Sequence, residues 1–328
     1  MQRNISLEQA IFDLKSDATS FEKVALSVFQ WQYENNSVYR QFCDLMQQNN
    51  PSCLHEIPFL PIAFFKDRAI LQENLSAKIL FQSSGTTGSK RSAHHVAFPT
   101  IYEKSFIWTY EQKIGLPAKQ IIFALLPNYI AQGDSSLVYM VNHLINSTKH
   151  PLSGFFLGEL DQLVEKIALA KKEDREIILF GVSYAVLDLC EKELDLSHVT
   201  IIETGGMKGR RREMIKEELH EILIKHLAPK KLTSEYGMTE LLSQAYLCDD
   251  QYFDGPPWMK ILIRDTNDPK TFLPDNRSGG VNVIDLANLY SCAFIATDDL
   301  GQRINDGRFK VLGRFDNSDI RGCNLLVQ

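Results

Sequence analysis

The sequence predicts an α/β protein in which a mostly parallel sheet is layered with helices. Residues 120–126 form an almost continuous apolar run, which is typical of a parallel strand buried on both faces. Further strands are predicted at 176–180 and 199–202, and they alternate with helical patterns at 161–171 and 210–227. Such alternation indicates parallel strands joined by crossover helices.

The region before this alternation is predicted to be a helical cover followed by extended chain. From Ser6 to about Asn49, apolar residues recur at three- and four-residue spacing, with a break and a helix cap at Asn36-Ser37. Pro58 and Pro61 then forbid a regular helix. We therefore expect the apolar residues around them to form an extended segment docked on the core.

The remaining elements follow from local patterns. Residues 133–136 are a helix-start signature, and 181–183 are expected to form the turn between a strand and a helix that ends near residue 193. His94 and His95 alternate along a short strand, and each fits an ordinary hydrogen-bonded structural histidine. The other expected elements are strands at 77–80, 93–96 and 231–233 and a helix at 100–113.

Composition and charge argue against several classes of function. The chain has 328 residues, of which 44% are hydrophobic and 23% charged, as in ordinary globular proteins. Its net charge of −6 comes without a dominant basic face, so we expect no nucleic-acid partner. No apolar run of about 18 residues predicts a membrane span, and the N-terminus lacks the apolar core of a signal peptide. The six cysteines lie far apart without zinc-site spacing, which favours reduced thiols and a cytoplasmic location.

A polar loop at 81–91, with the sequence FQSSGTTGSKR, is the first candidate site. Its two glycines allow backbone N–H groups to surround an anion, and the hydroxyl side chains and the two cations add donors and charge. This pattern favours phosphate, although an ordinary polar turn has a similar composition. The spacing does not fit the Walker A pattern, which disfavours a P-loop kinase or GTPase.

Two further segments are candidate sites. In the first, residues 236–240 (YGMTE) offer an aromatic ring, a hydroxyl and a carboxylate able to hold Mg²⁺, or else Thr239 only caps a helix that starts at Glu240. In the second, Asp299 and Arg314 could hold a polar ligand such as ribose. The alternative is a hairpin turn at 298–301 with a surface ion pair between Arg314 and Asp316.

Together, these segments resemble in order and spacing the core motifs of the adenylate-forming superfamily, which includes acyl-CoA synthetases, luciferases and peptide-synthetase adenylation domains. The segments IPFLPIAFFK, LLPNYIAQGDSSLVYM, ETGGMKGRR and SDIRGC most resemble the acyl-protein synthetases, the LuxE-type component of bacterial fatty-acid reductases. The resemblance extends from about Phe21 to Cys323. It implies the fold of the large N-terminal domain of these enzymes, with ATP and Mg²⁺ as cofactors.

The resemblance also implies roles for individual residues. Those that match the family's phosphate loop are Ser83, Ser84, Gly85, Thr86, Thr87 and Gly88, with Lys90 or Arg91 nearby. Tyr236 matches the aromatic residue that stacks on adenine beside the Gly205-Gly206 turn, and Gly237 next to it allows a close backbone approach. Thr239 and Glu240 match the pair that contacts the α-phosphate and Mg²⁺, Asp299 matches the ribose-binding acid, and Arg314 matches the arginine that follows a glycine. Asp316 matches the hinge. Because residues 297–300 read TDDL where many relatives have TGDL, the choice between Asp298 and Asp299 stays open.

The end of the chain departs from most of the superfamily. Because the sequence ends at Gln328, the C-terminal subdomain with the adenylation lysine is expected to be absent or vestigial, as in acyl-protein synthetases. We therefore expect an adenylation domain at 1–312 and a short tail with the hinge at 313–328. Cys323 resembles the cysteine that is acylated in acyl-protein synthetases, and the alternative is an inert small apolar side chain.

Three functions are compatible with these patterns. The first is ATP-dependent activation of a carboxylic acid, which the resemblance makes a fatty acid, with transfer to Cys323 and then to an acyl-CoA reductase-type protein. The second is a CoA ligase of the phenylacetate-CoA ligase type. The third is a nucleotide-binding relative without turnover. Phe155, Phe156, Ser183 and Tyr184 are candidates for the acyl pocket.

Overall fold

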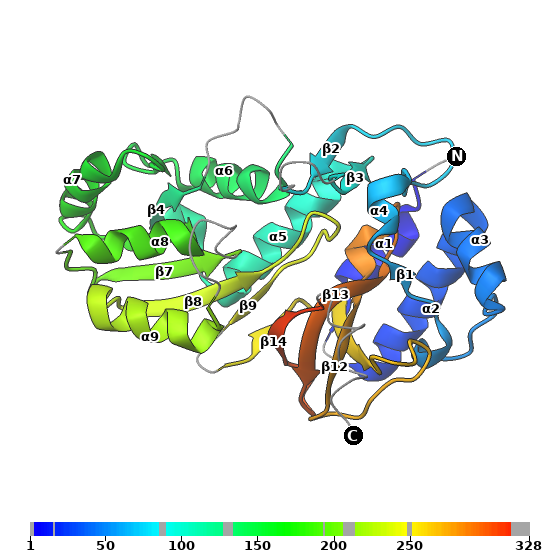
Figure 1. Cartoon of the computed structure of the whole chain (residues 1–328). Helices are drawn as coiled ribbons and strands as arrows, with labels where there is room; N and C mark the ends of the chain where they lie inside the picture. The colour runs from blue at the N-terminus through cyan, green and yellow to red at the C-terminus, as the bar shows by residue number, and fades with distance from the viewer. Residues whose placement is uncertain are drawn as a thin grey trace, which may run out of the picture. The chain divides into compact units, whose positions relative to one another are not determined.

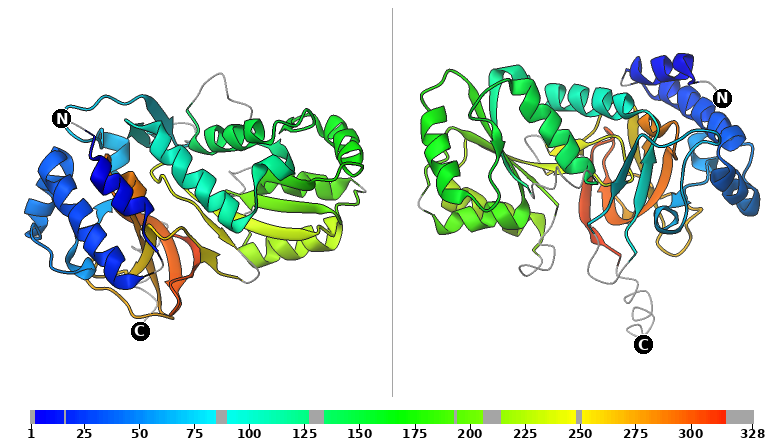
Figure 2. Two further views of the ribbon diagram at one scale, coloured as in Figure 1. Left: turned by 180° about the vertical axis from the view of Figure 1, so that it is seen from behind. Right: turned by 90° about the horizontal axis from the view of Figure 1, so that it is seen from above.

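The computed structural model describes residues 3–15, 17–84, 90–126, 134–192, 194–205, 214–247 and 251–315. The chain divides into two compact units. Unit 1 combines the chain up to Leu75 with the chain from Pro257 on, and unit 2 runs from Ser76 to Pro256. Figure 1 labels many of the helices and strands of both units, and Figure 2 gives two further views. The expected boundary at 312 stays a prediction.

Unit 2 is an α/β layer with a mostly parallel sheet, as the sequence predicts. The strand order is β10-β9-β8-β7-β6-β4-β5, in which β4 to β8 are parallel and β9 and β10 are antiparallel. β4 is buried along its whole length, which explains its apolar run. The strands are β4 (Gln120–Leu125), β5 (Gly154–Phe155), β6 (Glu176–Val182), β7 (Val199–Thr204), β8 (Lys231–Tyr236), β9 (Ala245–Leu247) and β10 (Phe253–Asp254).

Helices and one separate hairpin complete unit 2. The hairpin pairs β2 (Ile79–Gln82) with β3 (Ala93–Val96) in antiparallel register. α6 packs on β4, and α8 packs on β6 and β7. The α-helices are α5 (Pro99–Lys113), α6 (Ser136–Thr148), α7 (Leu160–Ala170), α8 (Ser183–Asp188) and α9 (Lys216–Leu227), and the short 3-10 helices are η2 (Pro117–Lys119) and η3 (Leu189–Glu191).

Two boundaries in unit 2 differ from the prediction. The expected turn at 181–183 is wrong, because β6 continues to Val182 and Ser183 already opens α8. Gly181 serves packing here, since a Cβ at this position would lie 2.7 Å from Cγ2 of Val186 in α8. The last helix begins at Lys216, whereas the sequence pattern predicts a start at residue 210; residues 206–213 lie outside the described ranges.

Unit 1 joins the predicted helical cover to an antiparallel sheet. A helix break and cap lie at Asn36-Ser37 as expected, and Asn36 is the cap of α3, because its Oδ1 accepts hydrogen bonds from the N–H groups of Val38 and Tyr39. The strand order is β11-β12-β13-β14, and β1 pairs in parallel with β13. The elements are α1 (Ile5–Phe12), α2 (Ala18–Asn35), α3 (Ser37–Met46), η1 (Leu54–Glu56), β1 (Leu60–Pro61), α4 (Phe64–Asp67), β11 (Met259–Arg264), β12 (Ser278–Asp285), η4 (Leu286–Asn288), β13 (Phe294–Arg303) and β14 (Phe309–Arg314).

Aromatic side chains form much of the core of unit 1. Phe29 of α2, Tyr39 of α3 and Phe294 of β13 pack together, with ring centroids 6.0 to 6.3 Å apart. Phe59, just before β1, adds a fourth ring at 6.1 Å from Phe294. The predicted docking of the proline-rich segment is therefore confirmed. No helix within the described ranges has the length and apolarity to cross a membrane.

Candidate functional site

The carboxyl ends of the parallel strands of unit 2 lie at one edge of the sheet. β4, β6, β7 and β8 run in the same direction, so the residues that follow them gather at this edge. Ligands of open α/β sheets bind outside such an edge. Gly205 directly follows β7, Tyr236 ends β8, and Gly237 comes next. These three predicted site residues therefore lie where the fold favours ligand binding.

The predicted phosphate loop has a well-defined stem. Gly85, Thr86, Thr87 and Gly88 lie outside the described residues, but both ends of the loop are described. The Ser83 N–H donates to the Ser92 carbonyl at 3.0 Å, and the Ser92 N–H donates to Ser83 Oγ at 2.9 Å. These bonds extend the β2–β3 pairing, so the polar loop leaves the hairpin after Ser84 and returns at Lys90, which is exposed.

Hydrogen bonds attach this stem to neighbouring segments of unit 2. The Gln82 N–H donates to the Asp134 carbonyl at 2.6 Å, and Arg91 Nη2 lies 3.0 Å from Asp134 Oδ2, just before α6 begins. On β3, Nδ1 of the buried His94 lies 2.8 Å from the Thr239 carbonyl. Because a carbonyl only accepts, His94 Nδ1 carries the proton. Loop stem, α6 start and Thr239 are thereby held together.

Thr239 and Glu240 lie in a turn between β8 and β9. The Leu241 N–H donates to the Met238 carbonyl at 3.1 Å, and β9 begins at Ala245. The alternative in which Thr239 caps a helix from Glu240 is therefore wrong, because the chain reverses here to pair antiparallel with β8. Glu240 is only 5% exposed.

Of the four residues predicted near adenine, Gly206 lies outside the described residues, and the other three have different surroundings. Gly205 has φ +73°, in the left-handed region that favours glycine, so this turn requires it. Tyr236 is 8% exposed, and its ring centroid lies 5.8 Å from that of Phe253. At Gly237, an added Cβ would press against Glu235 Oε1, so the Glu235 side chain would have to shift.

Asp299 and Arg314 meet across two neighbouring strands of unit 1. They are register partners on β13 and β14, and Arg314 Nε donates to Asp299 Oδ1 at 3.1 Å. The alternative of a hairpin turn at 298–301 is wrong, because these residues lie inside β13. Strand alternation buries Asp299 and exposes Asp298, so Asp299 is the carboxylate beside Arg314. Asp316 and Cys323 lie outside the described residues.

Comparisons with known proteins show which sequences and structures this chain resembles. No family model matches the chain. The chain is 23% identical over 344 residues to the long-chain-fatty-acid–luciferin-component ligase of Vibrio harveyi. The aligned region covers 92% of this chain and 86% of that protein. The structure also resembles an open 2-hydroxyisobutyryl-CoA ligase, with TM-score 0.66, 12% identity, and coverage of 93% of this chain and 72% of that one. The chain thus has the fold of adenylate-forming enzymes and is similar in sequence to one fatty-acid ligase.

The resemblance to acyl-protein synthetases and the predicted fold of an adenylate-forming enzyme are therefore confirmed. ATP-bound MatB from Rhodopseudomonas palustris is a further structural neighbour, with TM-score 0.55 and 18% identity. That match covers 76% of this chain and 49% of MatB, so this chain spans about half the length of that protein.

The sequence resemblance predicts Mg²⁺ as a cofactor, with Glu240 as its ligand. Within the described ranges, no group of three or more His, Cys, Asp or Glu side chains is arranged to hold a metal. Mg²⁺ is commonly bound by one or two carboxylates together with substrate phosphates. A single buried carboxylate in the turn after β8 fits this mode of binding.

The sequence patterns miss a buried charge network in this adenylate-forming fold. Glu203, near the end of β7, is fully buried and accepts hydrogen bonds from Ser183 Oγ at 2.7 Å and from Ser234 Oγ. Lys216 Nζ and His220 Nε2 of α9 lie 2.5 and 3.3 Å from Glu203 Oε1. Burial by itself raises the pKa of Glu203, but the Lys216 charge and the hydrogen bonds outweigh it and lower the pKa to about 2.

A second buried carboxylate, Glu235 on β8, has a raised pKa, whereas that of Glu203 is lowered. Its Oε2 accepts a hydrogen bond from the Thr204 hydroxyl. Burial, with a smaller contribution from the Glu203 charge, raises the pKa of Glu235 to about 7, although the Thr204 bond acts against the rise. The i,i+4 spacing of Lys216 and His220 is the only sequence signal for this network, and it does not reveal their partner.

The four candidates for the acyl pocket have different environments. Phe156 and Tyr184 are buried, and Phe156 packs against Phe123 with ring centroids 5.5 Å apart. Phe155 is half-buried, and Ser183 belongs to the Glu203 network. A role in binding an acyl chain stays a prediction for all four.

Proposed function

We propose that this chain activates a carboxylic acid with ATP as an acyl adenylate and transfers the acyl group to a cysteine thiol. The observation that carries the proposal is the bond from His94 to the Thr239 carbonyl. It holds the stem of the Gly/Ser/Thr loop against the Thr239–Glu240 turn. Two segments matched to ATP contacts, far apart in the sequence, are thus neighbours in unit 2.

The first step needs no general base. A carboxylic acid with a pKa near that of Glu, about 4.3, is already ionised at neutral pH. One carboxylate oxygen attacks the α-phosphorus of ATP, the bond from that phosphorus to the bridging oxygen breaks, and pyrophosphate leaves with the bonding electrons. The protein then has to align the reactants and stabilise negative charge on the phosphates.

The residues of unit 2 can supply these contributions. We assign the phosphates to the loop at Ser83, Ser84, Gly85, Thr86, Thr87 and Gly88, with Lys90 as an exposed cation at its end. The Thr239 hydroxyl would contact the α-phosphate. Glu240 would hold Mg²⁺, which neutralises phosphate charge when bound. Tyr236 and Gly237 with the Gly205-Gly206 turn would receive adenine.

Unit 1 is proposed to supply the ribose contact. The Asp299 carboxylate, held by Arg314 Nε at 3.1 Å, is an acceptor suited to ribose hydroxyls. Arg314 keeps 77% of its side chain exposed, so its guanidinium has surface left for a ligand. Arg314 itself belongs to the proposed tail at 313–328.

In the second step, the Cys323 thiolate attacks the acyl carbonyl, the bond to the adenylate oxygen breaks, and AMP leaves. A thiol with a pKa of about 8.5 provides some thiolate at pH 7. The named function of the Vibrio harveyi relative supports a long-chain fatty acid as substrate. We also propose a reductase-type protein as acyl acceptor after Cys323, and the expected cytoplasmic location stays a prediction.

The proposal is tested by incubating the protein with ATP, Mg²⁺ and ¹⁴C-labelled carboxylic acids, with and without CoA. We expect acid-dependent exchange of pyrophosphate into ATP, and label on the wild type but not on Cys323→Ala. Thr239→Ala should lower the exchange rate at least tenfold, because it removes a donor aimed at the reacting phosphate.

Other outcomes separate the alternatives. Soluble acyl-CoA in place of labelled protein would support the CoA ligase alternative. The structural similarity to 2-hydroxyisobutyryl-CoA ligase is the reason to test for this product. Absence of pyrophosphate exchange with every acid, together with measurable ATP binding, would leave the non-catalytic alternative.

A further inference from the structure

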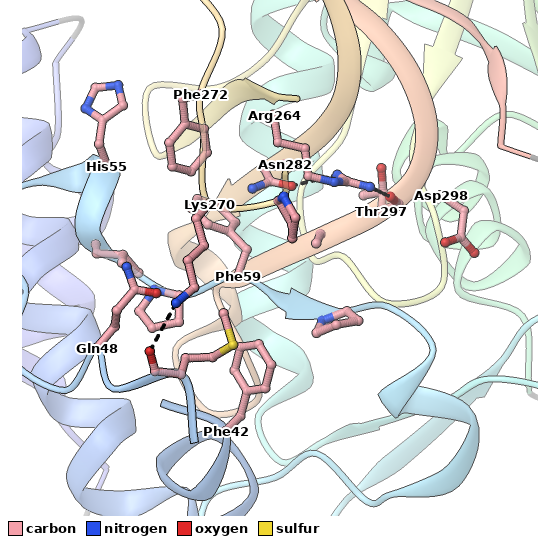
Figure 3. Close-up of a pocket in the computed structure, with 16 residues that line it drawn as sticks. Phe42, Gln48, His55, Phe59, Arg264, Lys270, Phe272, Asn282, Thr297 and Asp298 are labelled. Carbon is pink, nitrogen blue, oxygen red and sulfur yellow. Dashed lines mark hydrogen bonds between the residues drawn. The ribbon is translucent and has the colours of Figure 1, made fainter. Parts of the chain in front are cut away.

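Unit 1 contains a pocket of about 270 Å³ that the proposed reaction does not use. Its wall is formed by Phe42 and Met46 of α3, by Phe59 before β1, and by Phe272 in the loop after β11. Figure 3 shows Phe42, Phe59 and Phe272 around the pocket with Lys270 and Arg264. The volume is about nine times the 30 Å³ that a water molecule occupies in the liquid, which suits a ligand of about ten non-hydrogen atoms.

One end of the pocket is built around Arg264 of β11. Its Nη1 donates to the Val281 carbonyl at 2.8 Å and to Asn282 Oδ1 at 2.7 Å, and its Nη2 donates to the Thr297 carbonyl at 2.6 Å. Gly280 leaves room for this side chain, because an added Cβ would lie 2.6 Å from Arg264 Cζ. Two of the five guanidinium N–H groups thus have no acceptor within the described part of the chain.

Arg264 also fixes the orientation of the Asn282 amide. Since an arginine only donates, the amide oxygen has to face Arg264, and Nδ2 has to point away from it. Figure 3 shows this nitrogen on the side of Asn282 that faces Phe272. Asn282 is fully buried, and among the described residues Nδ2 has no hydrogen-bond partner. A buried N–H without an acceptor is unfavourable, so a ligand with an acceptor would stabilise this arrangement.

We propose that this pocket binds a small carboxylate with an apolar body, independently of the acid that is adenylated. The carboxylate would accept from Asn282 Nδ2 and from the two remaining N–H groups of Arg264, and the apolar body would pack against Phe42, Phe59 and Phe272. A carboxylate suits this end better than a neutral group, because its two oxygens accept several hydrogen bonds and its charge matches Arg264 and Lys270.

The probe for this site is 4-fluorobenzoate, followed by ¹⁹F NMR on the full chain. We expect saturable binding with a dissociation constant of about 1 mM or lower, and at least tenfold weaker binding of the neutral 4-fluorobenzamide. Asn282→Asp should weaken 4-fluorobenzoate binding at least tenfold, because it keeps the acceptor for Arg264 and replaces the donor with a negative oxygen.

Two further variants make the result decisive. Asp298→Asn changes an exposed carboxylate beside the pocket without touching the core, and it should tighten 4-fluorobenzoate binding two- to fivefold by removing repulsion. Thr239→Ala in unit 2 should leave the binding unchanged while it lowers pyrophosphate exchange. Absence of binding to the wild type, equal binding to folded Asn282→Asp, or loss of binding only in Thr239→Ala would each overturn the proposal.

Discussion

Glu235 gives the sharpest test of the electrostatics at the sheet edge. In the folded chain its pKa is about 7, against an ordinary value of 4.5, so ionising it inside the protein costs about 3 kcal/mol more than in the unfolded chain. Between pH 4.5 and 7 the folded state therefore holds a proton that the unfolded state has released. The free energy of unfolding should fall by about 3 kcal/mol as pH rises through this range and level off above it.

The perturbation is Glu235→Gln, whose neutral amide resembles the protonated carboxyl in shape and can still accept the Thr204 hydroxyl. The variant and the wild type should differ little near pH 4. At pH 8.5 the variant should be more stable by about 3 kcal/mol, because only the wild type then buries the second negative charge beside Glu203.

Urea unfolding of both proteins at several pH values between 4.5 and 8.5 measures this difference. Glu217→Gln removes an exposed carboxylate from α9 and serves as the matched control, with an expected change within about 0.5 kcal/mol at every pH. If Glu235→Gln and the wild type differed by the same amount at pH 5 and pH 8.5, the reasoning about the raised pKa would be refuted.

Three further predictions address packing, charge and the nucleotide. Gly181→Ala should lower the free energy of unfolding by about 1 to 3 kcal/mol, since its methyl group would lie 2.7 Å from a side chain of α8, whereas Gly154→Ala makes contacts of 3.5 Å and should change it little. Lys216→Met should cost about 2 kcal/mol in thermal or urea unfolding at pH 7 by leaving buried Glu203 without its cation, and the loss should shrink as pH falls from 4.5 towards 2 and Glu203 takes up a proton. Arg314→Ala should raise the KM for ATP in pyrophosphate exchange about tenfold, with a change in unfolding free energy below 1 kcal/mol, because the side chain is 77% exposed. An unchanged KM would argue against the proposed ribose contact.

Local sequence patterns predicted much of the fold because they report how each residue is buried. The apolar run at 120–126 indicated a strand covered on both faces, and β4 is buried throughout. The helix break and cap at Asn36-Ser37 were predictable because capping depends on the side chain and the next few residues alone. The error at Gly181 has the opposite origin, since a glycine in a strand end and a glycine in a turn look alike until the packing partner is known.

For the candidate site as well, some features follow from local sequence and others only from tertiary contacts. The sequence by itself determined the alternation of strands and helices, the polar loop at 81–91 and the motif residues at 236–240, because these depend on residues near one another in the chain. Only the tertiary structure decided that His94 joins the loop stem to Thr239, that Asp299 and not Asp298 meets Arg314, and that four distant residues surround Glu203. Such contacts depend on strand register and helix packing, which bring together residues whose separation in the sequence carries no signal of their proximity.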